Sequence, residues 1–136
     1  MTSQNPSIRL INPAAISQPT GYTHVVEVTG GKTVYISGQI AFDAEGKVVG
    51  VGDLAAQAHQ VFANLRAALA SVGADFTQVV KLNYYLLDMS QLPAVREIRN
   101  QYINTAQPPA STAVQVSGLA HPDLLIEIEA VAVIPA

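Results

Sequence analysis

The fold of this chain is decided by the stretch Leu124-Leu125-Ile126-Glu127-Ile128-Glu129-Ala130-Val131-Ala132-Val133. Its apolar and β-branched residues predict a long strand, and two acids interrupt the hydrophobic pattern. Successive side chains of a strand point to opposite faces, so Glu127 and Glu129 share one face. Burying a carboxylate without a partner costs several kcal/mol, so two acids in so apolar a strand require a partner or a function.

A second strand precedes this one in Pro108-Pro109-Ala110-Ser111-Thr112-Ala113-Val114-Gln115-Val116, and a short turn separates the two. Further upstream, segments rich in β-branched residues predict strands at residues 8–11, 24–28, 33–37 and 79–87. We expect the segments 24–28 and 33–37 to pair as a hairpin across the turn at residues 29–32. Residues 1 to about 7 are expected to form a loose tail on a single domain that spans residues 1–136.

Two segments with helical periodicity lie between these strands. The first begins after Asp53, a residue type that caps helices, and ends before Gly73, a residue type common just after them. Ser90 is expected to cap the second, which runs to about Asn104. Crossover connections are right-handed, so we predict an α+β fold with both helices on one face of a mixed sheet. The other face is left bare, which favours self-association.

The composition limits the classes of function. Hydrophobic residues make up 49% of the 136 residues and charged residues only 12%, which again favours an oligomer. With a net charge of −3 and seven Lys and Arg residues, the chain carries no basic stripe, so no nucleic-acid partner is expected. The absence of cysteine excludes disulfides and thiol nucleophiles. No apolar run is long enough to span a membrane, and residues 1–6 do not resemble a signal peptide, so we expect no membrane partner and a cytoplasmic location.

The three histidines, His24, His59 and His121, are scattered along the chain without a metal-ligand spacing. No phosphate-binding loop, dinucleotide fingerprint or nucleophile-elbow motif is present. We therefore expect neither a metal nor a cofactor.

These segments resemble the RidA (YjgF) family across nearly the whole chain. Members of that family carry a proline, a small residue, an arginine and Ser or Thr before a β-branched strand, and end in an Ile-Glu-Ile/Met-Glu-Ala-x-Ala strand. The Ser37-Gly38-Gln39-Ile40 turn matches the family as well. The resemblance implies a chorismate-mutase-like α+β fold whose last two strands form a closing hairpin. It also implies a homotrimer around a central barrel of sheets, with ligand clefts between subunits.

The resemblance also implies roles for individual residues. Glu127 would lie in the ligand cleft as a catalytic carboxylate that orients or activates water, although from the residues alone a solvated or backbone-bonded strand acid is the simpler interpretation. Glu129 is expected to be structural or interfacial. The substrate-binding residues implied by the resemblance are Tyr22, Ser37, Gly38, Ser111, Thr112 and Ala113. An ordinary loop aromatic and a strand-end turn are the simpler interpretations of Tyr22 and of the Ser37-Gly38 pair.

One departure from the family governs the prediction of activity, because Ser111 stands where the motif has arginine. In members with deaminase activity that arginine holds the carboxylate of an imino acid, while water attacks the C=N carbon to release ammonia and a keto acid. Serine cannot replace the bidentate, charged guanidinium. Three explanations remain open: a substrate without a carboxylate, replacement by Arg96 or Arg99, or loss of the deaminase activity. For the two arginines, the simpler interpretation is a solvated helix face.

We predict a hydrolytic deaminase of small reactive enamines or imines, of the 2-iminobutanoate/2-iminopropanoate deaminase type. The alternative is a family member that binds a small ligand in the intersubunit cleft without efficient deaminase activity. A third hypothesis, an activity directed at RNA, is disfavoured by the acidic charge balance.

Overall fold

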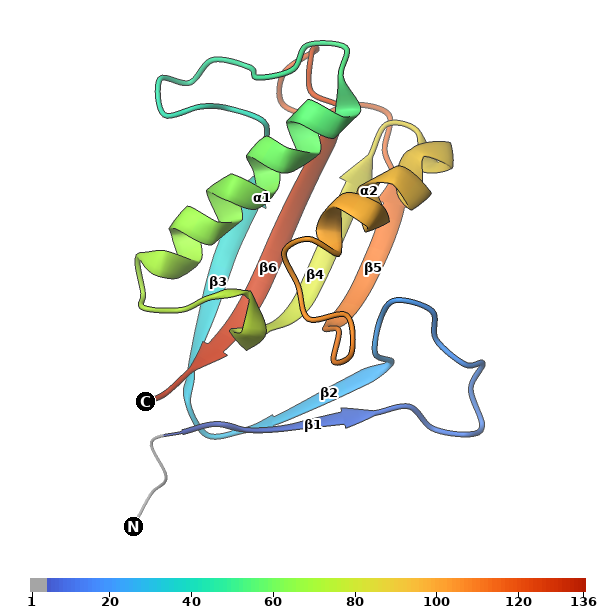
Figure 1. The fold of residues 1–136 in the computed structure, drawn as a ribbon, viewed down its shortest axis with the longest axis vertical. Coiled ribbons are helices and arrows are strands. Elements are labelled where there is room, and N and C mark those ends of the chain that lie inside the picture. Colours follow the sequence, from blue (N-terminus) through green and yellow to red (C-terminus); the bar gives the residue numbers. More distant parts are fainter. Residues whose placement is uncertain (1–4) are drawn as a thin grey trace.

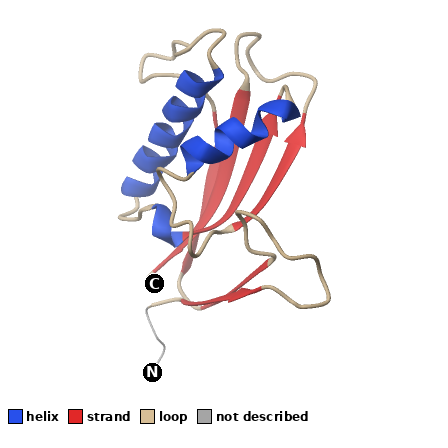
Figure 2. Cartoon of the chain, turned by 45° about the vertical axis from the view of Figure 1, so that its right-hand side comes forward, coloured by secondary structure: helices blue, strands red, loops and turns tan. Residues whose placement is uncertain are grey.

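Two helices pack against one face of a four-stranded sheet in the computed structural model, which describes residues 5–136 (Figures 1 and 2). The elements of this layer pair are β3 (Lys32–Gln39), α1 (Leu54–Ala70), β4 (Val79–Leu86), α2 (Leu92–Arg99), β5 (Ala110–Gln115) and β6 (Ile126–Ile134). Two short 3₁₀ turns, Phe76–Gln78 and Met89–Gln91, precede β4 and α2 respectively. The predicted α+β architecture, with a mixed sheet and both helices on one face, is confirmed.

The strands of the main sheet follow the order β3-β6-β4-β5. Strand β6 is antiparallel to both of its neighbours, whereas β4 and β5 are parallel and are connected through α2. The expectation that the last two strands form a hairpin is therefore wrong, because β4 lies between them. The physical reason is burial: β6 has one fully covered face and gains most from a central position, flanked by two strands.

The N-terminal strands β1 (Ser7–Ile11) and β2 (Val25–Thr29) form a separate antiparallel ribbon across the end of the main sheet (Figure 1). The predicted hairpin between 24–28 and 33–37 is wrong, since β2 pairs with β1 and β3 pairs with β6. The ribbon is held just before the start of β5, where the Thr23 amide donates to the Pro109 carbonyl and the Thr23 hydroxyl to the Pro108 carbonyl. Of the expected tail, residues 1–4 lie outside the described residues and Ser7 begins β1.

Helix α1 begins as predicted, with the Asp53 carboxylate accepting a hydrogen bond from the Ala56 amide at 3.1 Å. Gly73 follows its end at a φ of +73°, a conformation that glycine adopts without steric cost. Helix α2 is shorter than predicted and ends at Arg99, after which the chain continues as a tight turn. Ser90 is not its cap, because the Asp88 carboxylate accepts from the Ser90 amide and starts the preceding 3₁₀ turn.

The core lies between the sheet and the helices. Its largest fully buried side chains include Phe62, Leu65, Leu69, Leu82, Leu86, Ile126 and Ile128. No helix of the described residues is both long and apolar enough to cross a membrane.

No helix covers the opposite face of the sheet (Figure 2). Because Ile126 and Ile128 are buried under the helices, Glu127 and Glu129 point to this open face, as the strand period predicted. The neighbouring strands add polar groups there, and Tyr35 is 80% exposed. The homotrimer stays a prediction, and this face is the surface that would serve it.

Candidate functional site

Glu127 and Gly38 meet on the open face of the sheet, at a register shift between Ile36 and Gln39 in β3. A Cβ atom added to Gly38 would lie 2.7 Å from Glu127 Cδ and 2.9 Å from its Cγ. No side chain fits at that separation, so the absence of one at position 38 is what lets the carboxylate lie against the strand. The structure thus brings together two residues that the sequence could only associate through a family resemblance. Ser37, beside them, is exposed.

The two acids of β6 differ in their partners. Glu129 accepts hydrogen bonds from the Asn83 side-chain amide at 3.1 Å and the Tyr85 hydroxyl at 2.5 Å. The bond to Glu129 raises the pKa of Tyr85. Among residues 5–136, no protein group donates a hydrogen bond to the side-chain carboxylate of Glu127. Glu129 therefore has a structural role, and the half-buried carboxylate of Glu127 remains available to water or a ligand.

The other predicted site residues gather on the helix-covered side of the sheet, around a pocket of about 180 Å³. Its lining consists of Tyr22, Tyr84, Leu92, Arg96, Arg99, Ser111 and Ala113. Thr112 does not belong to it, because alternation along β5 turns Thr112 to the open face, where its hydroxyl accepts from Lys81 Nζ at 2.9 Å. The predicted site is therefore divided between the two faces of one sheet.

Arg99 is only 6% exposed and fully engaged. Its Nη1 donates to the Gly21 carbonyl at 2.9 Å, and its Nε and Nη2 donate to Asn100 Oδ1 at 3.2 and 3.0 Å. Gly21 has a φ of +78°, and a Cβ there would lie 2.9 Å from Arg99 Nη2. Arg99 thus fixes the loop that carries Tyr22 into the pocket.

Arg96 lies one turn earlier on α2 and is half-buried. Its guanidinium forms no hydrogen bond or ion pair with any residue that the structure describes, although its backbone carbonyl accepts from the Asn100 amide. Of the two arginines proposed as replacement cations, Arg96 is therefore the one with a free guanidinium.

Sequence reasoning missed Tyr84, which points from β4 into the same pocket and is 3% exposed. Its hydroxyl is buried without a hydrogen-bond partner among the described residues. Burial raises the pKa of Tyr84 to about 12, although the positive charge of Arg99, the close approach of its guanidinium to the hydroxyl and the charge of Arg96 oppose the shift. The alternation of residues along β4 indicates which of its side chains face the helices. The position of Tyr84 beside Ala113, however, follows from the parallel pairing of β4 with β5.

Comparison with known proteins decides the family. Residues 13–134 match the family model described as "Endoribonuclease L-PSP", to which the YjgF, RidA and RutC proteins belong. The chain belongs to the RidA (YjgF) family. Its relatives include protein DfrA of Myxococcus xanthus, which is 40% identical over 112 residues, 82% of this chain and 84% of that protein.

Another RidA-family relative is the human 2-iminobutanoate/2-iminopropanoate deaminase, 40% identical over 102 residues, 75% of this chain and 73% of that protein. Among solved structures, the Rid-family protein YyfB of Yersinia pestis superimposes with a TM-score of 0.81 at 37% identity, covering 96% of this chain and 99% of that chain. These matches confirm the family and the fold that the sequence motifs predicted.

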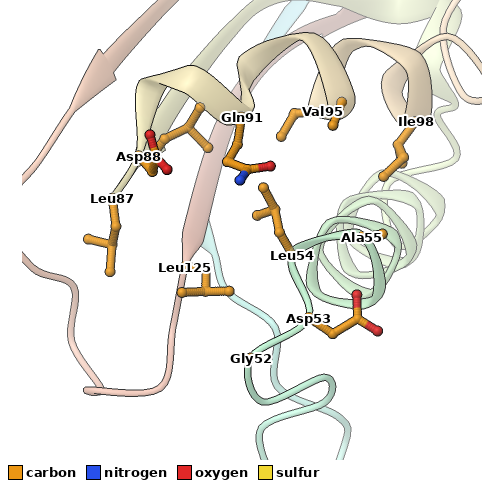
Figure 3. A pocket seen from close by; sticks show the side chains of 12 residues that line it. Gly52, Asp53, Leu54, Ala55, Leu87, Asp88, Gln91, Val95, Ile98 and Leu125 are labelled. Atoms are coloured by element: carbon orange, nitrogen blue, oxygen red, sulfur yellow. The ribbon is translucent and has the colours of Figure 1, made fainter.

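A larger pocket, of about 470 Å³, lies between the start of α1 and helix α2 (Figure 3). Its lining is largely apolar and includes Leu54, Leu87, Val95, Ile98 and Leu125. Its two carboxylates, Asp53 and Asp88, accept hydrogen bonds from amides at the starts of the adjacent helical turns. It therefore lacks the convergent free polar groups that orient a small reactive ligand.

The structure brings no metal-binding cluster together within residues 5–136, where no three His, Asp or Glu side chains are grouped. His24 contacts the Ser17 carbonyl, and His59 contacts the Tyr102 hydroxyl at 2.9 Å. His121 accepts from the Asp123 amide at 3.1 Å. Each histidine thus has its own local partner in a different part of the fold.

Proposed function

We propose that this RidA-family protein hydrolyses small reactive enamines or imines, releasing ammonia and a carbonyl product. The observation that carries the proposal is the Glu127 carboxylate, which lies against Gly38 and has no protein donor among the described residues. The deaminase name of the human relative supports the same reaction.

The chemistry asks little of the protein, because an imine carbon is already electrophilic. Glu127 would accept a proton from a bound water while the water oxygen attacks the C=N carbon. The imine nitrogen would gain a proton in the same step. In the resulting carbinolamine the hydroxyl loses its proton and the amino nitrogen gains one, so the C–N bond breaks, ammonia leaves and the C=O bond forms. The absence of a side chain at Gly38 leaves the space that this carboxylate occupies against the strand.

The division of the site between two sheet faces bears on the assembly. A sheet separates Glu127 from the pocket around Ser111, so one small substrate cannot contact both within a single protomer. In a homotrimer, the Glu127–Gly38 pair of one protomer would face the Ser111 pocket of the next. We therefore propose a cleft shared between subunits, and light scattering coupled to size-exclusion chromatography would measure the trimer mass.

The alternative function is binding of a small ligand without efficient turnover. The observation that favours it is Ser111, which supplies one neutral hydroxyl where deaminating relatives are expected to use a charged anchor.

A coupled assay tests the proposal. An amino-acid oxidase generates a 2-imino acid, and release of the keto acid is followed with and without this protein. Replacing Glu127 with Ala or Gln is expected to lower the acceleration by about 10²- to 10⁴-fold, as for loss of a general base. Glu129→Gln is the matched control on the same strand face. Undiminished turnover by Glu127→Ala would remove Glu127 from the mechanism, and no acceleration by the unmodified protein would favour the binding function.

A further inference from the structure

We propose that Arg96 and the Tyr84 hydroxyl form a binding site for the carboxylate of a small 2-imino or 2-oxo acid. Arg96 approaches this site from helix α2, and no arginine is needed on strand β5. This inference deepens the proposed function, because it names the group that would hold the substrate and the class of substrate held.

The charges of the pocket support an anionic ligand. Two guanidinium groups, Arg96 and Arg99, lie one helical turn apart on its wall, and none of its lining residues is acidic. Like charges at this helical spacing repel each other. Arg99 already donates to Gly21 and Asn100, so Arg96 is left to pair with an anion.

Tyr84 provides a second, independent indication. Its hydroxyl is buried at the pocket beside the Arg99 guanidinium, but no group among residues 5–136 meets it with hydrogen-bond geometry, and buried polar groups are nearly always hydrogen-bonded. A carboxylate oxygen accepts hydrogen bonds only, and it would satisfy both the hydroxyl and the guanidinium. A neutral ligand could satisfy the hydroxyl but would leave the guanidinium unpaired.

The small residues of β5 explain why the cation comes from the helix. Ser111 and Ala113 line the pocket opposite α2, and their short side chains leave the volume into which Arg96 can reach. A volume of about 180 Å³ suits a ligand of only a few non-hydrogen atoms. Tyr22, held by the Arg99–Gly21 contact, closes one side.

Binding can be tested without catalysis by calorimetric titration with 2-oxobutanoate, the stable keto acid of the expected reaction, and with butan-2-one as its uncharged analogue. We expect the unmodified protein to bind 2-oxobutanoate and to bind butan-2-one far more weakly. Arg96→Ala should weaken 2-oxobutanoate binding by roughly 10- to 100-fold, and Arg96→Lys should recover part of the loss. Arg9→Ala removes the same charge from the exposed ribbon and should leave binding unchanged.

A double variant separates a direct contact from a structural effect. Adding Ser111→Arg to Arg96→Ala places a guanidinium back at the pocket from strand β5, so binding of 2-oxobutanoate should return. Thermal unfolding of each variant checks that the fold is retained. Tyr84→Phe should weaken 2-oxobutanoate binding while the protein stays folded.

Different results would contradict the proposed carboxylate site and the proposed deaminase function. If binding of 2-oxobutanoate depends on Arg96 but the oxidase-coupled assay shows no turnover, the carboxylate site is supported and the proposed deaminase activity is rejected. If Arg96→Ala shows full turnover and unchanged 2-oxobutanoate binding, the deaminase activity is supported and the role of Arg96 in binding the carboxylate is rejected. Failure of the unmodified protein to bind 2-oxobutanoate, or equal weakening by Arg9→Ala, would also overturn it.

Discussion

Replacing Gly38 with alanine tests the geometry of the Glu127 carboxylate directly. Gly38 does not have a positive φ, so alanine is compatible with its backbone and the effect is purely steric. The new Cβ would lie 2.7 Å from Glu127 Cδ, whereas ordinary van der Waals contact begins near 3.4 Å. The carboxylate carbon must therefore retreat by at least about 0.7 Å, and Cγ must move with it.

The magnitude follows from this displacement. Misplacing a reacting group by about 1 Å costs on the order of 100-fold in rate, so we expect kcat/KM to fall by roughly 10- to 100-fold in Gly38→Ala. The cost to stability should be smaller, about 1 kcal/mol, because the far end of a glutamate can swing away. Gly118→Ala is the matched control, since a Cβ there meets nothing within 4 Å.

The assays are the oxidase-coupled rate and the free energy of unfolding in urea at one fixed protein concentration. A double-mutant cycle with Glu127→Ala isolates the contact: with the glutamate truncated, Gly38→Ala should cost almost nothing further in stability. Full activity of Gly38→Ala would refute the proposed placement of the carboxylate. An equal loss of stability in the Glu127→Ala background would show that the clash involves another group.

Three further predictions concern two buried polar side chains, Tyr84 and Gln57. Tyr84→Phe should stabilise the ligand-free protein by about 1 kcal/mol at neutral pH, because it removes a buried hydroxyl without a described partner. The pKa of Tyr84 is raised to about 12, so the unfolded chain releases this proton first as pH rises above 10. The unmodified protein should then lose about 2 kcal/mol between pH 10 and 12 relative to Tyr84→Phe, and parallel pH-dependent unfolding curves would contradict this. Gln57 is fully buried, and its side chain bonds the Gly50 and Asp123 carbonyls and the Leu125 amide. Gln57→Leu should cost about 3 kcal/mol in urea unfolding, well above the cost of the control Gln60→Leu, and equal costs would show that these bonds contribute little.

The limits of sequence prediction are clear at particular elements. The capping residue Asp53 and the strand at residues 79–87 were predicted because their signals are local. The second helix was predicted too long and capped at the wrong residue, because the competing Asp88 cap starts a 3₁₀ turn three residues earlier. Both predicted hairpins are wrong, because β2 pairs with β1 instead of β3, and β4 lies between β5 and β6.

The candidate site was only partly predictable. The motif residues 111–113 were expected to act together, although strand alternation alone places Thr112 on the opposite face from Ser111 and Ala113. Tyr84 carried no motif, and its role depends on the parallel pairing of β4 with β5. The sequence could not predict that Arg99 is hydrogen-bonded while the Arg96 guanidinium is not, because both arginines share one helix face in the sequence pattern.

By itself, the sequence determined the periodicity of each element, the shared face of Glu127 and Glu129, the family and the serine at position 111, because these depend on residue type and local spacing. Only the tertiary structure decided which strands are neighbours, which glutamate keeps a free carboxylate, and which arginine stands unpaired beside a buried hydroxyl. Those outcomes depend on contacts between residues far apart in the chain, where several pairings satisfy the same local pattern and burial selects one of them.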